Sequence, residues 1–115
     1  MPFQFNAKSV YLTYPQAELL SKAQVLFQAH QWGDVKSYFI AREQHEDGNH
    51  HIHAYLEYLD PVRTRSPNYF DCTVGSNVYH PNIQRPRNKF DVLRYLSKED
   101  QDPLTNLESI EPVGR

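Results

Sequence analysis

Cysteine, glycine and long apolar runs are all scarce in this sequence, and each scarcity excludes a class of protein. The one cysteine, Cys72, in 115 residues rules out an internal disulfide and any cysteine-rich zinc motif, which leaves nitrogen and oxygen as metal ligands. The four glycines form no G-x-x-x-x-G-K-[ST] loop, which excludes a P-loop nucleotide site in this chain. No apolar run approaches the length of a membrane span or signal peptide, so we expect a soluble, non-secreted protein with no membrane partner.

The charge is unevenly distributed along a chain whose length fits a single domain. The formal net charge is −2, yet residues 61–98 carry seven basic against two acidic residues, and residues 99–115 carry one basic against five acidic. Such a basic segment is either an ordinary solvated face or a phosphate-binding surface. Its members are Arg63, Arg65, Arg85, Arg87, Lys89, Arg94 and Lys98.

The sequence predicts strands alternating with helices. Residues 7–14 are β-branched and aromatic and precede Pro15, which is typical of a strand followed by a turn. Residues 35–43 predict a second strand, and the "EDGN" turn signal at 46–49 leads into a third strand over 50–58, which makes a hairpin.

Two helices are expected. Ser21 followed by Gln24 forms a capping box, so the first helix begins near Lys22, and Gly33 suits its C-terminal cap. The second helix spans 88–100, begins at an Asn N-cap and carries an apolar stripe at helical spacing. The stripe consists of Val92, Leu93 and Leu96.

Three of the six histidines fall within residues 50–53. Because side chains alternate across a strand, His51 and His53 share one face while the apolar residues between them share the other. Glu43 ends the preceding strand and could complete a chelate of two nitrogens and one oxygen with open positions on the metal. Two alternatives stay open here: a solvent-facing pair and a pair with a structural role.

Tyr95 and Lys98 lie one turn apart on the less apolar face of the second helix. Taken alone, the pair fits a tyrosine at the edge of the core beside a surface lysine. A tyrosine near a divalent metal is also what a phosphodiester-cleaving transesterase needs, since the metal polarises the phosphate and the phenol attacks. A phenol with a pKa of about 10 then requires nearby positive charge.

Three ordered segments carry a resemblance to a known family. "YLTYPQ" (11–16), "HIH" (51–53) and "YLSK" (95–98) resemble the motifs of the HUH endonucleases, the rolling-circle replication initiators of circular single-stranded DNA viruses. Residues 68–84, "NYFDCTVGSNVYHPNIQ", resemble the recognition segment of geminivirus and genomovirus initiators. The opening "MPFQFNA" is similar to the genomovirus branch. The resemblance covers nearly the whole chain.

The resemblance implies an α+β fold of the ferredoxin-like or RNA-recognition-like kind. We expect a single central antiparallel sheet of about five strands, with the histidine strand central, helices packed mainly on one face, and Tyr95 on a helix across the open face. Residues 1–100 would be the endonuclease domain. Residues 101–115 would be an acidic tail leading toward a helicase domain that this chain does not contain.

The family pattern also implies site roles. Glu43, His51 and His53 would bind Mg²⁺ or Mn²⁺, Tyr95 would be the nucleophile, and Lys98 would contact the phosphate or assist the metal-bound state.

The resemblance further implies contacts with DNA, from residues that match the first motif or the recognition segment and from basic residues that would contact the backbone. Core packing is the alternative for Tyr14, Phe70 and Ile83. The matching residues are Thr13, Tyr14, Gln16, Phe70, Asp71, His80, Pro81, Asn82 and Ile83, and the basic ones are Arg63, Arg65, Arg85, Arg87, Lys89 and Arg94.

By the same resemblance, the expected activity is nicking and rejoining of single-stranded DNA in the loop of an origin hairpin, through a 5′-phosphotyrosine intermediate. Expected partners are origin DNA and the host replication machinery, in the host nucleus, with oligomerisation through regions outside this chain. Two other interpretations remain: a non-catalytic single-strand binding module, and a metal-dependent phosphoesterase that uses water. Dependence on Tyr95 separates the three.

Overall fold

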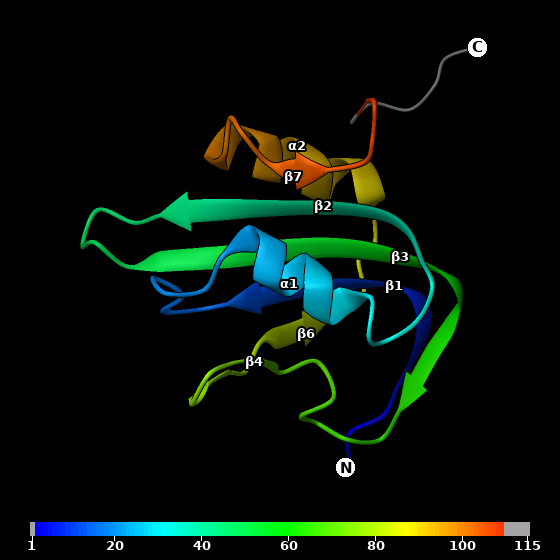
Figure 1. Cartoon of the computed structure of the whole chain (residues 1–115). Helices are drawn as coiled ribbons and strands as arrows, with labels where there is room; N and C mark the ends of the chain where they lie inside the picture. The colour runs from blue at the N-terminus through cyan, green and yellow to red at the C-terminus, as the bar shows by residue number, and fades with distance from the viewer. Residues whose placement is uncertain (1, 110–115) are drawn as a thin grey trace.

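A five-stranded antiparallel sheet forms the centre of the molecule in a computed structural model, which describes residues 2–109 (Figure 1). Its strands, in spatial order, are β6 (Asn82–Gln84), β1 (Phe5–Tyr14), β3 (His50–Thr64), β2 (Val35–Gln44) and β7 (Leu104–Thr105). Two further strands, β4 (Cys72–Val74) and β5 (Asn77–Tyr79), form a separate hairpin. The predicted α+β class, the five-stranded sheet and the central histidine strand are all confirmed.

Strand β3 is buried on both faces. Ile52, Ala54 and Leu56 point to one face and are fully buried, as the alternation in the sequence predicts. On the other face, His53 and Tyr55 are also buried. Both faces of the sheet therefore need a covering layer.

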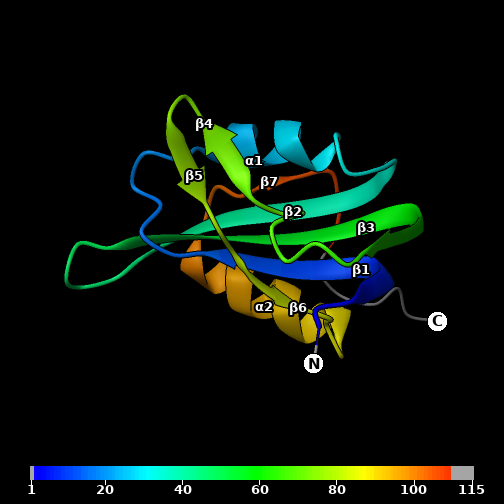
Figure 2. The same cartoon turned by 90° about the horizontal axis from the view of Figure 1, so that it is seen from below.

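One helix covers each face, as Figure 2 shows. Helix α1 (Lys22–Ala29) packs through Val25 on the side of Ile52, in the larger core cluster. Helix α2 (Lys89–Glu99) packs through Leu93 and Leu96 on the opposite side, and the partners of that pair are Phe39, Ala41 and Tyr55. The expected helix across the open face, which carries Tyr95, is confirmed. The helices do not gather mainly on one face, because the second face of β2 and β3 is itself apolar and is covered by α2.

The predicted N-terminal caps of both helices are present. Ser21 Oγ accepts from Gln24 N at 3.0 Å, and Gln24 Oε1 accepts from Ser21 N at 2.8 Å. Asn88 Oδ1 accepts from Phe90 N and Asp91 N at 3.0 and 3.2 Å. These bonds satisfy donors that a helix start leaves unpaired.

The predicted C-terminal cap of α1 at Gly33 is wrong. The cap is His30, and tight turns continue the chain from there, with Gln31 N donating to Gln28 O at 2.9 Å. Gly33 instead permits a close approach, since a Cβ at this position would lie 3.1 Å from a ring carbon of Tyr58.

The end of α2 is fastened to the rest of the fold by Asp100. Its Oδ2 accepts from Lys22 Nζ at 2.7 Å and from the backbone N of Arg42 at 2.8 Å, which joins α2 to α1 and to β2. Beyond it, β7 pairs with β2 through Leu104 and Thr105. The predicted tail thus begins with residues that contribute to the sheet, and its last part, 110–115, lies outside the described residues. Its linking role stays a prediction.

No helix of the described chain is long and apolar enough to cross a membrane.

Replacing Asp100 should destabilise the protein. Partial burial raises the pKa of this carboxyl, but the bonds from Lys22 and Arg42 outweigh it and hold the pKa below its usual range. A group with a depressed folded pKa contributes stability above its unfolded pKa of about 3.9 and loses it as the pH falls through the folded value. We expect Asp100→Ala to lower the free energy of unfolding by about 1–3 kcal/mol at pH 7, and by less near pH 3, in urea denaturation.

Asp91→Ala is the matched control. Its ion pair with Arg94, at 2.8 Å, is exposed, and such pairs contribute about 1 kcal/mol or less. Equal losses of unfolding free energy in the two variants, or the same loss for Asp100→Ala at both pH values, would contradict the stabilising role of Asp100.

Candidate metal and nucleophile site

The carboxylate of Glu43 joins two of the predicted site residues. Its Oε1 accepts from His53 Nε2 at 2.7 Å, and its Oε2 accepts from the Tyr95 hydroxyl at 2.9 Å. The three side chains come from β2, β3 and α2. The predicted nucleophile therefore shares one carboxylate with a predicted metal ligand.

His51 belongs to the same cluster, together with a histidine that the sequence interpretation missed. In the register of the hairpin His51 lies opposite Glu43. His45 lies just past the end of β2, with its Nε2 3.3 Å from His51 Nδ1 and 3.7 Å from Glu43 Oε1. Potential ligand atoms of Glu43, His45 and His51 lie within 4.8 Å of one another. The spacing Glu-x-His at 43 and 45 was the signal that could have indicated His45.

The donor set fits a divalent metal ion. The atoms within 4.8 Å of one another offer one carboxylate oxygen and imidazole nitrogens from His45 and His51. His53 is not in that group, but it bonds the same carboxylate, and its ring lies 6.2 Å from the ring of His51. Imidazole favours transition metals, whereas Mg²⁺ prefers oxygen. The nitrogen donors favour a transition-metal ion, and the carboxylate oxygen also suits Mg²⁺ and Mn²⁺.

The local electrostatics keep Glu43 and His53 in the protonation states that bind metal. Partial burial raises the pKa of Glu43, but hydrogen bonds from His53 and Tyr95 outweigh it and leave the pKa below its usual range. Burial lowers the pKa of His53, although the Glu43 carboxylate acts in the opposite direction. At neutral pH the pair is a carboxylate and a neutral imidazole, which are the metal-binding states.

Tyr95 is accessible but held protonated. Its side chain is 45% exposed, and its ring meets the ring of His53 edge-on at 6.1 Å. Partial burial and the Glu43 carboxylate raise the pKa of Tyr95 to about 12. Lys98 lies one turn further along α2 and is exposed; within residues 2–109, no hydrogen bond or ion pair joins it to the cluster.

The first-motif residues divide into buried and accessible ones. Thr13 Oγ1 lies 3.2 Å from His53 Nδ1. Tyr14 is fully buried, with its hydroxyl donating to the carbonyl of Phe70, which is also fully buried. Gln16 is exposed and has a positive φ of 51°. The burial of Tyr14 and Phe70 favours the packing alternative for both.

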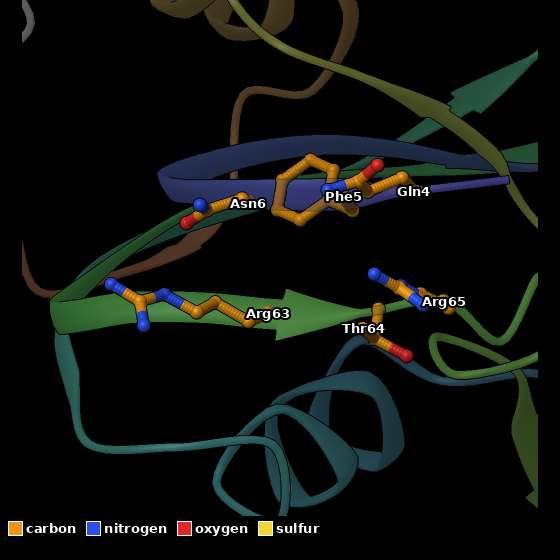
Figure 3. A pocket seen from close by; sticks show the side chains of 6 residues that line it. All are labelled: Gln4, Phe5, Asn6, Arg63, Thr64 and Arg65. Carbon is orange, nitrogen blue, oxygen red and sulfur yellow. The ribbon is translucent and has the colours of Figure 1, made fainter.

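Arg63 and Arg65 project from the end of β3 into a cavity of about 340 Å³ (Figure 3). The rest of its lining comes from Gln4, Phe5, Asn6 and Thr64. The guanidinium of Arg85 lies 5.6 Å from the ring centre of Phe5. Three arginines are thus gathered beside the start of β1.

A second hollow, of about 420 Å³, lies between β6 and the start of α2. Arg85, Arg87 and Tyr11 line it, together with residues of the α2 N-terminus. Tyr11 also places its hydroxyl 3.0 Å from His53 Nδ1. One aromatic side chain thereby connects this basic hollow to the metal-ligand cluster.

The other residues predicted to contact DNA have neighbours of their own. Asp71 and His80 form an ion pair of 2.6 Å, and Lys89 Nζ lies 3.0 Å from Glu57 Oε1. Asn82 is exposed on β6, and Ile83 packs, half-buried, against the larger core cluster. Their contacts with DNA, like those of Arg94, stay predictions.

Comparison with known proteins shows the family of this chain. The family model of the geminivirus Rep catalytic domain matches residues 3–106. The chain is 32% identical over 102 residues to the replication-associated protein of Cabbage leaf curl virus (isolate Jamaica), covering 84% of this chain and 29% of the relative. It is 34% identical over 101 residues to replication-associated protein A of Chloris striate mosaic virus, covering 86% of this chain and 33% of the relative. The chain spans about a third of the length of these relatives. It belongs to the geminivirus Rep catalytic domain family.

Proposed function

We propose that this chain nicks and rejoins single-stranded DNA by metal-dependent transesterification, with Tyr95 as the nucleophile. The observation that carries the proposal is the shared carboxylate, since Glu43 bonds both the Tyr95 hydroxyl and His53. Membership of a Rep catalytic domain family supports a nuclease role in replication initiation.

Glu43, His51 and His53 would hold the divalent ion, with His45 as a further ligand. The preferred ion is Mn²⁺, and Mg²⁺ is the alternative. When bound, the ion acts as a Lewis acid that polarises the scissile phosphate and stabilises the developing negative charge.

The chain's own residues carry out the substitution. Tyr95 Oη attacks phosphorus and the bond to the 3′-oxygen breaks, so that the 5′-phosphate remains on Tyr95. The phenolic proton passes to solvent, to which the side chain of Tyr95 is 45% exposed, and a proton from solvent ends on the released 3′-hydroxyl. Attack by a 3′-hydroxyl on the phosphotyrosine reverses every step and rejoins the strand.

Lys98 would supply positive charge to this reaction. The neighbouring carboxylate helps to raise the pKa of Tyr95 to about 12, so a phenolate at neutral pH needs compensating charge. An exposed ammonium one turn from Tyr95 can approach the phosphate once DNA is bound.

The proposed substrate is the loop of a viral origin hairpin. The arginines around the two hollows, Arg63, Arg65, Arg85 and Arg87, would contact the DNA backbone, which positions a strand without reading its sequence. The released 3′-hydroxyl would prime a host polymerase in the host nucleus. The longer protein would oligomerise through regions outside this chain. The names of the relatives, both replication-associated proteins of viruses, support this setting.

Removing the phenol should abolish covalent capture of DNA. We expect wild-type protein with Mn²⁺ and a single-stranded origin-loop oligonucleotide to give a slower protein band on a denaturing gel. Tyr95→Phe should give neither the band nor the cut, because it removes the hydroxyl that bonds Glu43 beside the histidine cluster.

Tyr69→Phe is the matched control, because its hydroxyl bonds the distant carbonyl of Trp32. Cleavage without an adduct would indicate a nuclease that uses water. Binding without any cleavage by the wild-type protein would leave a DNA-binding module.

The ligand set can be tested without DNA. We expect His51→Ala, His53→Ala and His45→Ala each to weaken Mn²⁺ binding by about tenfold or more, the equivalent of about 1.4 kcal/mol, in a calorimetric titration. His80→Ala should bind Mn²⁺ like wild type, because His80 pairs with Asp71 outside the cluster. Unchanged affinity in His45→Ala would exclude His45 as a ligand.

Lys98 should affect the rate and leave metal binding unchanged. We expect Lys98→Ala to slow single-turnover cleavage by about 10²-fold, the cost of losing one group that stabilises transition-state charge. The Mn²⁺ affinity should stay at the wild-type value, and Lys98→Arg should recover part of the rate. Wild-type cleavage by Lys98→Ala would remove Lys98 from the mechanism.

A further inference from the structure

Two hydroxyl groups converge on the ring nitrogen of His53 that faces away from Glu43. The Tyr11 hydroxyl lies 3.0 Å and Thr13 Oγ1 lies 3.2 Å from Nδ1. Both come from β1, where Thr13 is directly opposite His53 in the strand register. The Tyr11 ring also stacks on the imidazole at 5.9 Å, with 19° between the planes. The orientation of this buried ring is therefore determined from two sides.

The two nitrogens of His53 have partners of different chemistry. A carboxylate only accepts hydrogen bonds, so a neutral His53 bonded to Glu43 carries its proton on Nε2, and Nδ1 then accepts from a hydroxyl. When a metal takes Nε2, the proton must lie on Nδ1, which then donates. A hydroxyl can serve both states because it both donates and accepts, whereas a backbone carbonyl could serve only the second.

We propose that Tyr11 and Thr13 are positioning residues that hold His53 as a metal ligand by accommodating both of its tautomers. The inference rests on the proposed function, because it takes His53 Nε2 as a ligand. Metal binding then removes one proton from Nε2 and places one on Nδ1, the ring stays neutral, and the hydroxyl that bonds Nδ1 changes from donor to acceptor. Thr13 thereby acts on the metal site, in addition to or in place of its predicted contact with DNA.

The site also gives the two hydroxyls unequal surroundings. Thr13 sits between the fully buried Leu12 and Tyr14 in the middle of the sheet, and its short side chain has little freedom to move away. The Tyr11 ring lines the basic hollow beside α2, where a nucleotide would approach. Either hydroxyl alone can pair with Nδ1, so loss of both should cost far more than loss of one.

The test uses Tyr11→Phe, Thr13→Val and the double variant, which keep the ring and the β-branched shape. We expect the double variant to bind Mn²⁺ about 10- to 100-fold more weakly than wild type in a calorimetric titration, which is the cost of losing support for a metal-bound histidine. Each single variant should show a smaller loss. Imidazole ¹⁵N spectra of wild type should show the His53 proton moving from Nε2 to Nδ1 as Mg²⁺ is added.

Tyr69→Phe is again the control and should keep wild-type affinity. Wild-type Mn²⁺ affinity in the double variant overturns the proposal, including when that variant has a lower melting temperature, since the hydroxyls would then only satisfy a buried nitrogen. Weakened DNA binding in EDTA with unchanged Mn²⁺ affinity overturns it in favour of direct DNA contact. These titrations contain no cleavable DNA, so their outcome is separate from that of the adduct assay on which the proposed function depends.

Discussion

The position of the Tyr95 phenol depends on one carboxylate. Glu43 bonds His53 with one oxygen and Tyr95 with the other, which joins the sheet to α2 at the middle of the helix. The helix is also fixed at both ends, by Lys89 on Glu57 at its start and by Asp100 at its end. Three polar attachments along one helix, together with the packing of Leu93 and Leu96, determine where the phenol lies.

The apolar second face of the sheet is what brings that helix to the site. Phe39, Ala41 and Tyr55 require cover, and α2 provides it with its buried leucines. His53 lies on the same face and becomes 5% exposed, while Tyr95, on the rim of the helix, keeps 45% of its surface. His53 is buried and the Tyr95 phenol beside it is accessible because α2 covers the first and carries the second at its edge.

Periodic features of the sequence predicted much of the fold and of the candidate site, and isolated residues did not. The alternation over 50–58 correctly placed His51 and His53 away from the core residues Ile52 and Ala54, and the hairpin turn brought Glu43 opposite His51. The short strands β6 and β7 have too few residues for any period to appear. His45 lies in the turn, where no strand alternation assigns a side, and the contact of Tyr11 with His53 joins residues 42 positions apart. Contacts between side chains that far apart in the sequence depend on strand order, which the local sequence pattern does not determine.

The same carboxylate that positions the phenol also restrains it. The hydrogen bond and the negative charge of Glu43 help to raise the pKa of Tyr95 to about 12, and the hydroxyl is therefore a poor nucleophile while that contact is intact. Under the proposed function, a cation held by Glu43 competes with Tyr95 for the carboxylate and replaces a negative neighbour by a positive one. Both changes favour the phenolate. The precise placement of the phenol and its low reactivity in the absence of metal thus have a single physical origin, and under the proposed function Tyr95 would be activated only when the metal site is filled.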